Sequence, residues 1–324
     1  GPVDVIGDVH GELEALQRLV QRLGYDRHGE HRFGRRLVFV GDLCDRGPDS
    51  PGVLRWVQDL CMRGLAQTVL GNHELNILRR QRKHGNDWFF DDAGTARDRE
   101  FADVIEFLES IPVALERADL RVVHACWDEA SLARSATGTG SVLQRFEHHE
   151  AAVLAIAEQN GLTAAADEEL ARHRTALADP MRVPPLCLAL AKHEAFTQMG
   201  NPLRVLTSGV EQVATAPFHA GGKWRMVERV PWWQAYPAAT PVIFGHYWRW
   251  WNPAAHILLS KGEVPLFRDV APADWLPTAQ GQQAFCIDYS VGARYVERRR
   301  RPQGPFEGRL AAMRWPEREL VFDA

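Results

Sequence analysis

Three short motifs, rich in glycine and in metal-binding side chains, follow one another near the start of the chain. They read GDVHG at 7–11, GDLCDRG at 41–47 and GNHE at 71–74, about thirty residues apart. Each motif directly follows a short apolar stretch, a pattern typical of a strand that ends in a turn. Open α/β sheets place their ligands at the carboxyl ends of the strands. The spacing therefore predicts that the three motifs meet at one edge of a sheet.

Helical patterns fill the gaps between these motifs. Apolar residues recur with helical spacing over 12–23, 50–61 and 74–82, as expected for helices with one buried face. Strand, loop and helix thus repeat three times, which is typical of a layered α/β fold. A further helix is expected over 97–110. Later strands are expected at 121–124, 204–207, 225–230, 242–245, 284–290 and 309–315.

The middle of the chain has a different character. Residues 141–178 are rich in Ala, Glu and His with helical spacing, and prolines follow soon after. We therefore expect one domain over 3–324, with 131–200 as a helical cap inserted into it. Gly1 and Pro2 are typical of the remnant that a protease leaves after removal of a tag.

Composition narrows the classes of function. The chain has 324 residues, 45% of them hydrophobic, which is enough for a large core. A formal net charge of −4 provides no global basic field and argues against nucleic acid as a partner. No apolar run approaches the roughly 18 residues of a membrane span. Five scattered cysteines favour a reducing, cytoplasmic compartment.

Two later segments extend the motif series, VVHA at 122–125 and FGHYW at 244–248. Together the five blocks resemble the calcineurin-like metallophosphoesterases. The DRG and GNHE forms resemble the phosphoprotein-phosphatase branch, which also holds diadenosine tetraphosphate hydrolases. FCIDYS at 285–290 and MRW at 313–315 resemble bacterial diadenosine-tetraphosphatase-like and serine-threonine-phosphatase-like members. The resemblance covers most of 3–130 and 201–324, and it implies a β-sandwich flanked by helices.

The resemblance also implies a site for two divalent metal ions that share one carboxylate. It assigns the first ion to Asp8, His10 and Asp42. It assigns the second ion to Asp42, Asn72, His124 and His246. Independently of any family, Asp, His and Asn together suit borderline divalent metals, and two Asp with several His suit a pair. We expect Mn²⁺ first, with Fe, Zn²⁺ or Co²⁺ as alternatives.

The same resemblance assigns roles around the transferred phosphate. It makes His73 the general acid, oriented by Asp45, while Arg46 and Asn72 bind phosphate oxygens. An imidazole held by a carboxylate has a raised pKa and can donate a proton near pH 7. The alternative for Asp45 is an ion pair with Arg46 that only stabilises the loop.

The sequence thus predicts a two-metal phosphoesterase that hydrolyses phosphate monoesters or phosphoanhydrides by in-line attack of a metal-bridging hydroxide. The candidate substrates are diadenosine tetraphosphate-type dinucleotides, a phosphoprotein or another phosphorylated small molecule. Alternatives are an RNA or nucleotide end-processing phosphatase and a metal-binding regulatory module without turnover. Three features stay open: the tryptophans between Trp232 and Trp251 (base stacking or core), the run Arg298–Arg301 (an anion site or a solvated loop), and Asp288.

Overall fold

Two five-stranded β-sheets form the centre of the molecule in a computed structural model that describes residues 1–220, 222–255 and 265–324. The first sheet has the order β12-β11-β1-β2-β3. Its strands are β1 (Val3–Ile6), β2 (Arg36–Phe39), β3 (Ala66–Thr68), β11 (Ala311–Trp315) and β12 (Glu319–Phe322). Strands β1, β2 and β3 are parallel, and β11 joins β1 antiparallel. The predicted strands before the three motifs are therefore confirmed.

The second sheet collects strands from both halves of the chain, in the order β4-β5-β8-β10-β9. Its strands are β4 (Ala114–Arg117), β5 (Leu120–Val123), β8 (Val242–Phe244), β9 (Leu276–Thr278) and β10 (Gly281–Cys286). The central strands β5, β8 and β10 run parallel. Strand β10 ends at Cys286, so the second half of the strand expected at 284–290 is instead a loop.

The two sheets pack against each other through a shared apolar layer. Val5, Val38 and Val69 of the first sheet belong to the same buried cluster as Ile243 and Phe285 of the second. Alternate residues of a strand point to opposite faces, so each sheet contributes one face to this layer. The predicted mixed α/β fold, a β-sandwich with flanking helices, is confirmed.

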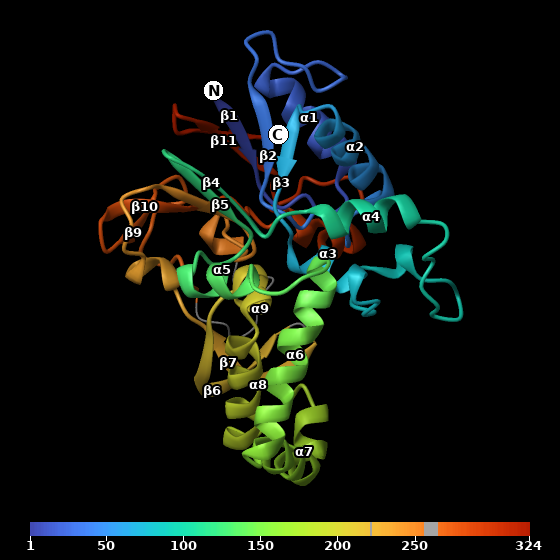
Figure 1. Ribbon diagram of the computed structural model, residues 1–324, viewed down its shortest axis with the longest axis vertical. Coiled ribbons are helices and arrows are strands. Elements are labelled where there is room, and N and C mark those ends of the chain that lie inside the picture. The colour runs from blue at the N-terminus through green and yellow to red at the C-terminus, as the bar shows by residue number, and fades with distance from the viewer. Residues whose placement is uncertain (221, 256–264) are drawn as a thin grey trace.

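Helices cover the outer face of the first sheet (Figure 1). They are α1 (Leu13–Leu23), α2 (Ser50–Met62), α3 (Asn72–Leu78) and α4 (Ala102–Ser110). Helix α1 buries Leu16, Leu19 and Leu23 along one stripe, as its sequence period predicts. Asp49 caps α2 by accepting a hydrogen bond from the backbone N–H of Gly52. Helix α4 is shorter than the expected 97–110 and is preceded by the 3₁₀ turn η1 (Asp87–Phe89).

Aromatic side chains cover the outer face of the second sheet. The 3₁₀ turn η2 (Trp232–Ala235) places Trp232 and Trp233 against Phe244 of β8. Both tryptophans are buried. For this pair, the core interpretation of the tryptophan cluster is therefore confirmed.

An arm projects away from the sandwich (Figure 1). It contains α6 (Val142–Gln159), α7 (Leu162–Ala178), α8 (Leu188–Gly200) and the hairpin of β6 (Glu211–Ala220) and β7 (Lys223–Arg229). Helix α5 (Glu129–Ser135) lies between the arm and the second sheet in this view. The segment 131–200 is helical as expected, and its role as a cap stays a prediction.

One predicted strand is wrong. Residues 204–207, expected as a strand, belong to helix α9 (Pro202–Ser208). Asn201 caps this helix by accepting a hydrogen bond from Leu203 N–H, and Pro202 occupies the first turn. These two features favour a helix even though the β-branched residues that follow favour a strand.

The arginine run, which the sequence left open between an anion site and a solvated loop, lies largely in helix α11 (Arg294–Arg300), which follows the 3₁₀ turn η3 (Val291–Ala293). Arginines in the last turn of a helix are stabilised by the helix dipole. Arg298 also pairs with Glu12 at the start of α1. None of the helices within the described residues combines the length and apolar character needed to cross a membrane.

Candidate metal centre

The carboxyl ends of five strands bring the predicted residues together. Asp8 and His10 follow β1, Asp42 follows β2, and Asn72 begins α3 after β3. In the second sheet, His124 follows β5 and His246 follows β8. Because β1, β2 and β3 are parallel, as are β5 and β8, each set of loops emerges at one edge of its sheet.

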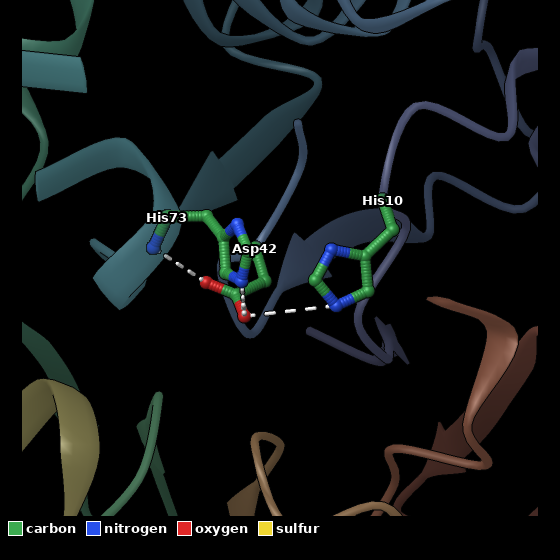
Figure 2. A group of neighbouring side chains, drawn as sticks. All are labelled: His10, Asp42 and His73. Carbon is green, nitrogen blue, oxygen red and sulfur yellow. Dashed lines mark hydrogen bonds and ion pairs between the residues drawn. The ribbon is translucent and has the colours of Figure 1, made fainter. Parts of the chain in front are cut away.

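Asp42 occupies the middle of this cluster. Its Oδ2 lies 3.7 Å from His10 Nε2 and 3.9 Å from His73 Nε2, and both rings point toward the carboxylate (Figure 2). Its Oδ1 lies 3.3 Å from His124 Nε2. Two triplets have the geometry to hold an ion, with ligand atoms within 4.8 Å of one another: His10, Asp42 and His73, and Asp42, His124 and His246. Asp42 belongs to both triplets.

The other two predicted ligands lie against these triplets. Asn72 Oδ1 is 3.1 Å from His124 Nε2 and 2.9 Å from His246 Nδ1. The Asp8 carboxylate accepts a hydrogen bond from His246 N–H and lies 3.9 Å from His10 Nε2. The structure thus brings all six predicted ligands together, although their binding of metal stays a prediction.

Backbone carbonyls orient two of the histidines. His10 Nδ1 lies 3.1 Å from the Cys44 carbonyl, and His124 Nδ1 lies 2.7 Å from the Val40 carbonyl. A carbonyl only accepts, so Nδ1 donates in both rings and Nε2 faces Asp42. A histidine held in this way is the usual arrangement of a metal ligand.

The charges of the site fit cations. Burial, followed by the negative charge of Asp288, raises the pKa of Asp8. Burial raises the pKa of Asp42, but His124 and His73 outweigh burial and hold that pKa below its ordinary value. Buried carboxylates so close together are stabilised by positive charge. Oxygen and imidazole ligands together suit Mn²⁺, Fe, Zn²⁺ or Co²⁺.

Glu74 fixes the loop that carries Asp42. The buried carboxylate accepts hydrogen bonds from the backbone N–H groups of Asp42 (2.8 Å), Leu43 (2.8 Å) and Gly71 (3.0 Å). The second and third motifs are therefore joined by one side chain. Asp42 itself has φ of 50°, a left-handed conformation that costs energy for a residue other than glycine. The Glu74 contacts compensate for part of that cost.

His73 and Asp45 form a buried pair. His73 Nδ1 lies 2.6 Å from Asp45 Oδ2, and the other carboxylate oxygen accepts from Trp88 Nε1 at 2.7 Å. Among the described residues, no ion pair joins Asp45 to Arg46, so the alternative of an Asp45–Arg46 pair does not describe this loop. Trp88 was not among the predicted site residues, because it lies in η1, 43 residues after Asp45, and belongs to none of the motifs.

Arg46 contacts the candidate metal ligands through His10. Its Nη1 is 2.8 Å from His10 Nε2, and its guanidinium carbon lies 4.8 Å from the centre of the Trp248 ring. Trp248 therefore differs from the buried Trp232–Trp233 pair, because it contacts a predicted phosphate-binding residue. Asp288 supports this loop by accepting hydrogen bonds from the backbone N–H groups of Trp248 and Ser290.

The fold and the site define an α/β protein with a candidate two-metal centre at the common edge of its strands. Residues 1–125 match the family model described as calcineurin-like phosphoesterase. Over these residues the chain is thus similar to the calcineurin-like phosphoesterases, in agreement with the motifs at 7–11, 41–47 and 71–74.

Curated relatives match a similar share of the chain, and a solved structure aligns over all of it. The asymmetrical bis(5'-nucleosyl)-tetraphosphatase of Halalkalibacterium halodurans is 37% identical over 137 residues, covering 38% of this chain and 56% of the relative. The symmetrical bis(5'-nucleosyl)-tetraphosphatase of Ralstonia nicotianae is 38% identical over 127 residues, covering 38% and 41%. The chain thus spans about half the length of these curated relatives. The solved cold-active protein-tyrosine phosphatase of a Shewanella species aligns over 100% of this chain and 80% of its own, with TM-score 0.49 and 14% identity.

Proposed function

We propose that this protein is a two-metal-dependent hydrolase of phosphate monoesters or phosphoanhydrides. The observation that carries the proposal is the position of Asp42, whose carboxylate lies between His10 on one side and His124 and His246 on the other and belongs to both candidate triplets. A shared carboxylate holds two cations roughly 3.5–4 Å apart, which is the spacing of two-metal hydrolases.

The predicted ligands divide between two cations, for which Mn²⁺ is our first candidate. Asp8, His10 and Asp42 would hold one cation. Asp42, Asn72, His124 and His246 would hold the other. Such cations, when bound, supply an activated water and offset the charge that develops on phosphoryl oxygens.

The remaining polar side chains act on the phosphate itself. Arg46 is largely buried beside His10, and its guanidinium can form two parallel hydrogen bonds with phosphoryl oxygens. The contact with the Trp248 ring restrains the guanidinium plane. His73 donates a proton from Nε2 to the leaving oxygen, while the Asp45 carboxylate holds Nδ1.

Dinucleoside polyphosphates are the substrate class that we favour. Two relatives named bis(5'-nucleosyl)-tetraphosphatases share 37% and 38% identity with parts of this chain. A phosphoprotein is the competing substrate, because the Asp45 and His73 pair also suits a poor alkoxide leaving group.

The five cysteines are all free, which supports a reducing cytoplasmic location.

The deciding experiment incubates Mn²⁺-loaded protein with diadenosine tetraphosphate and, separately, with a phosphoserine peptide. We expect nucleotide release with little phosphate from the peptide. Two ADP molecules would indicate a symmetrical cut, and AMP with ATP an asymmetrical one. Fast release of phosphate from the peptide with an intact dinucleotide would refute the preferred substrate. Turnover of neither compound, with metal retained, would refute the hydrolase.

A further inference from the structure

Strand β7 carries a row of cations beside the candidate metal centre. Lys223, Arg225 and Arg229 fall on one face of the strand, with the buried Val227 between the last two, because alternate residues point the same way. The opposite face carries Trp224 and Met226, which pack in a cluster with residues of α8. We call Lys223, Arg225 and Arg229 the β7 basic face.

The inner end of this face adjoins the predicted metal ligands. The guanidinium carbon of Arg229 lies 5.5 Å from the centre of the Tyr247 ring, and Tyr247 directly follows His246. The strand then leads away along the arm. Its six-residue span from Arg229 to Lys223 corresponds to about 20 Å at the usual rise per residue.

A second group of cations lies near the outer end. Arg79, at the end of α3, and Arg204, in α9, both contact the ring of Phe146, with guanidinium carbons 4.2 Å and 5.4 Å from its centre. Partial burial, followed by the positive charges of Arg79, Lys223 and Arg204, lowers the pKa of Lys83. Lys83 is therefore influenced by cations from its own stretch of chain, from α9 and from β7. We call Arg79, Lys83 and Arg204 the α3 basic cluster.

The α3 basic cluster is also linked to the phosphate-binding residue Arg46. The backbone N–H of Arg46 donates a 2.7 Å hydrogen bond to the carbonyl of Gly85, two residues after Lys83. Both basic groups thus begin next to residues of the candidate metal centre, one beside His246 and the other beside Arg46.

Acidic side chains offset only part of this charge. Glu150 binds Arg204, and Glu211 lies 3.7 Å from Arg225. Glu147 and Glu194 also contribute negative charge nearby. In the part of the chain that the structure describes, Arg79, Lys83 and Lys223 form no ion pair with a carboxylate. Like charges gathered in this way create a field that attracts a polyanion.

We propose that the β7 basic face and the α3 basic cluster bind the phosphates of a linear polyphosphate chain that lie beyond the phosphate being cleaved. The inference deepens the proposed function and depends on it. A substrate with a single phosphate fills the metal centre without reaching either group. The two basic groups therefore select polyphosphates over simple phosphomonoesters.

Lys83→Gln, Lys223→Gln and the double variant test this selection. The matched control is Arg172→Gln on α7, which removes an exposed cation that pairs with Glu168 of its own helix. We expect the KM for diadenosine tetraphosphate to rise at least about tenfold in the double variant, because the loss of one hydrogen bond to a charged group weakens binding by roughly that factor. The kcat, and both constants for 4-nitrophenyl phosphate, should match those of wild type and of the control. Equal losses on both substrates, or no loss on the dinucleotide, would overturn the proposal.

A binding measurement separates this proposal from the proposed function. Calorimetric titration of Mn²⁺-loaded protein, with free Mn²⁺ held constant, compares orthophosphate with a linear inorganic polyphosphate long enough to span the roughly 20 Å of the β7 basic face. We expect the polyphosphate to bind at least about tenfold tighter to wild type, and the double variant to lose this advantage while orthophosphate binding is unchanged. This result without any turnover would refute the hydrolase and keep the polyphosphate site. Turnover with equal affinity of wild type and double variant for the polyphosphate would refute the site alone.

Discussion

The indole Nε1 of Trp88 donates a 2.7 Å hydrogen bond to Asp45, although the two residues lie 43 positions apart in the chain. The same carboxylate holds His73 through its other oxygen. Trp88 therefore restrains the side chain that orients the proposed general acid, without itself reaching the reacting atoms.

Trp88→Phe should slow hydrolysis by disordering this pair. Phenylalanine keeps most of the packing against Phe89 and Phe101 but removes the donor. We expect kcat to fall about three- to tenfold, the net worth of one hydrogen bond, and the acidic group in the pH–rate profile to shift. The control is Trp315→Phe, which removes an equivalent hydrogen bond to Asp119 away from the site. An unchanged pH profile would contradict the positioning role.

His73→Asn should affect substrates according to their leaving groups. When a phosphoserine peptide is hydrolysed, the serine oxygen leaves as an alkoxide that needs a proton. The 4-nitrophenolate ion of 4-nitrophenyl phosphate leaves readily without one. We expect at least about a hundredfold loss on the peptide and a much smaller loss on 4-nitrophenyl phosphate. Steady-state rates on both substrates give the comparison. Equal losses would remove His73 from the role of general acid.

Asp42→Asn should abolish the shared ligand. An amide carries no charge to hold two cations together, so we expect the protein to retain less than its full metal content after dialysis and to lose at least about a hundredfold in rate. Metal analysis and turnover are measured on the same sample. Asp59→Asn, which changes an exposed carboxylate paired with Arg63, is the control. Full metal content with normal turnover would exclude a bridging role.

Glu74→Gln should weaken the fold even without metal. The carboxylate accepts from four backbone N–H groups, two on each oxygen, and the amide of glutamine turns the two contacts of one oxygen into clashes of donors. We expect a loss of about 2–3 kcal/mol in the free energy of unfolding. Urea denaturation of the metal-free protein measures this loss. Glu116→Gln, at an exposed ion pair, should change stability by less than about 1 kcal/mol.

Glu150 should make stability depend on acid pH. Burial raises its pKa, but the hydrogen bonds from Arg204 and Asn201 outweigh burial and lower it below 4.5. The stabilisation is therefore present above pH 4.5 and is lost as the pH falls through the folded-state pKa. Glu150→Gln should cost about 1 kcal/mol at pH 7 and less at pH 3.5. A constant difference between variant and wild type at both pH values would contradict this linkage.

The strand ends and most of the candidate site were predictable from the sequence. Apolar stretches before the three motifs fix β1, β2 and β3, and parallel strands place their loops at one edge. His124 and His246 were predicted only from the family resemblance, because no local sequence pattern relates either residue to the three motifs near the start of the chain. Their convergence on Asp42 depends on the packing of two sheets.

Other features depend on contacts that no local pattern reveals. Residues 204–207 have the composition of a strand, yet the Asn201 cap makes them helical. The contact of Trp88 with Asp45 requires η1 to return to the second motif. The alternation of Lys223 and Arg225 is visible in the sequence, but its approach to Lys83 follows only from the position of the arm.

Helix α3 has a consequence for substrate length. It begins with Asn72 and His73 at the candidate metal centre and ends against Arg79 of the α3 basic cluster. A helix is rigid and rises 1.5 Å per residue, so His73 and Arg79 are held about 9 Å apart along its axis. For the proposed polyphosphate substrate, α3 acts as a molecular ruler. Chains shorter than this distance reach only one of its two ends.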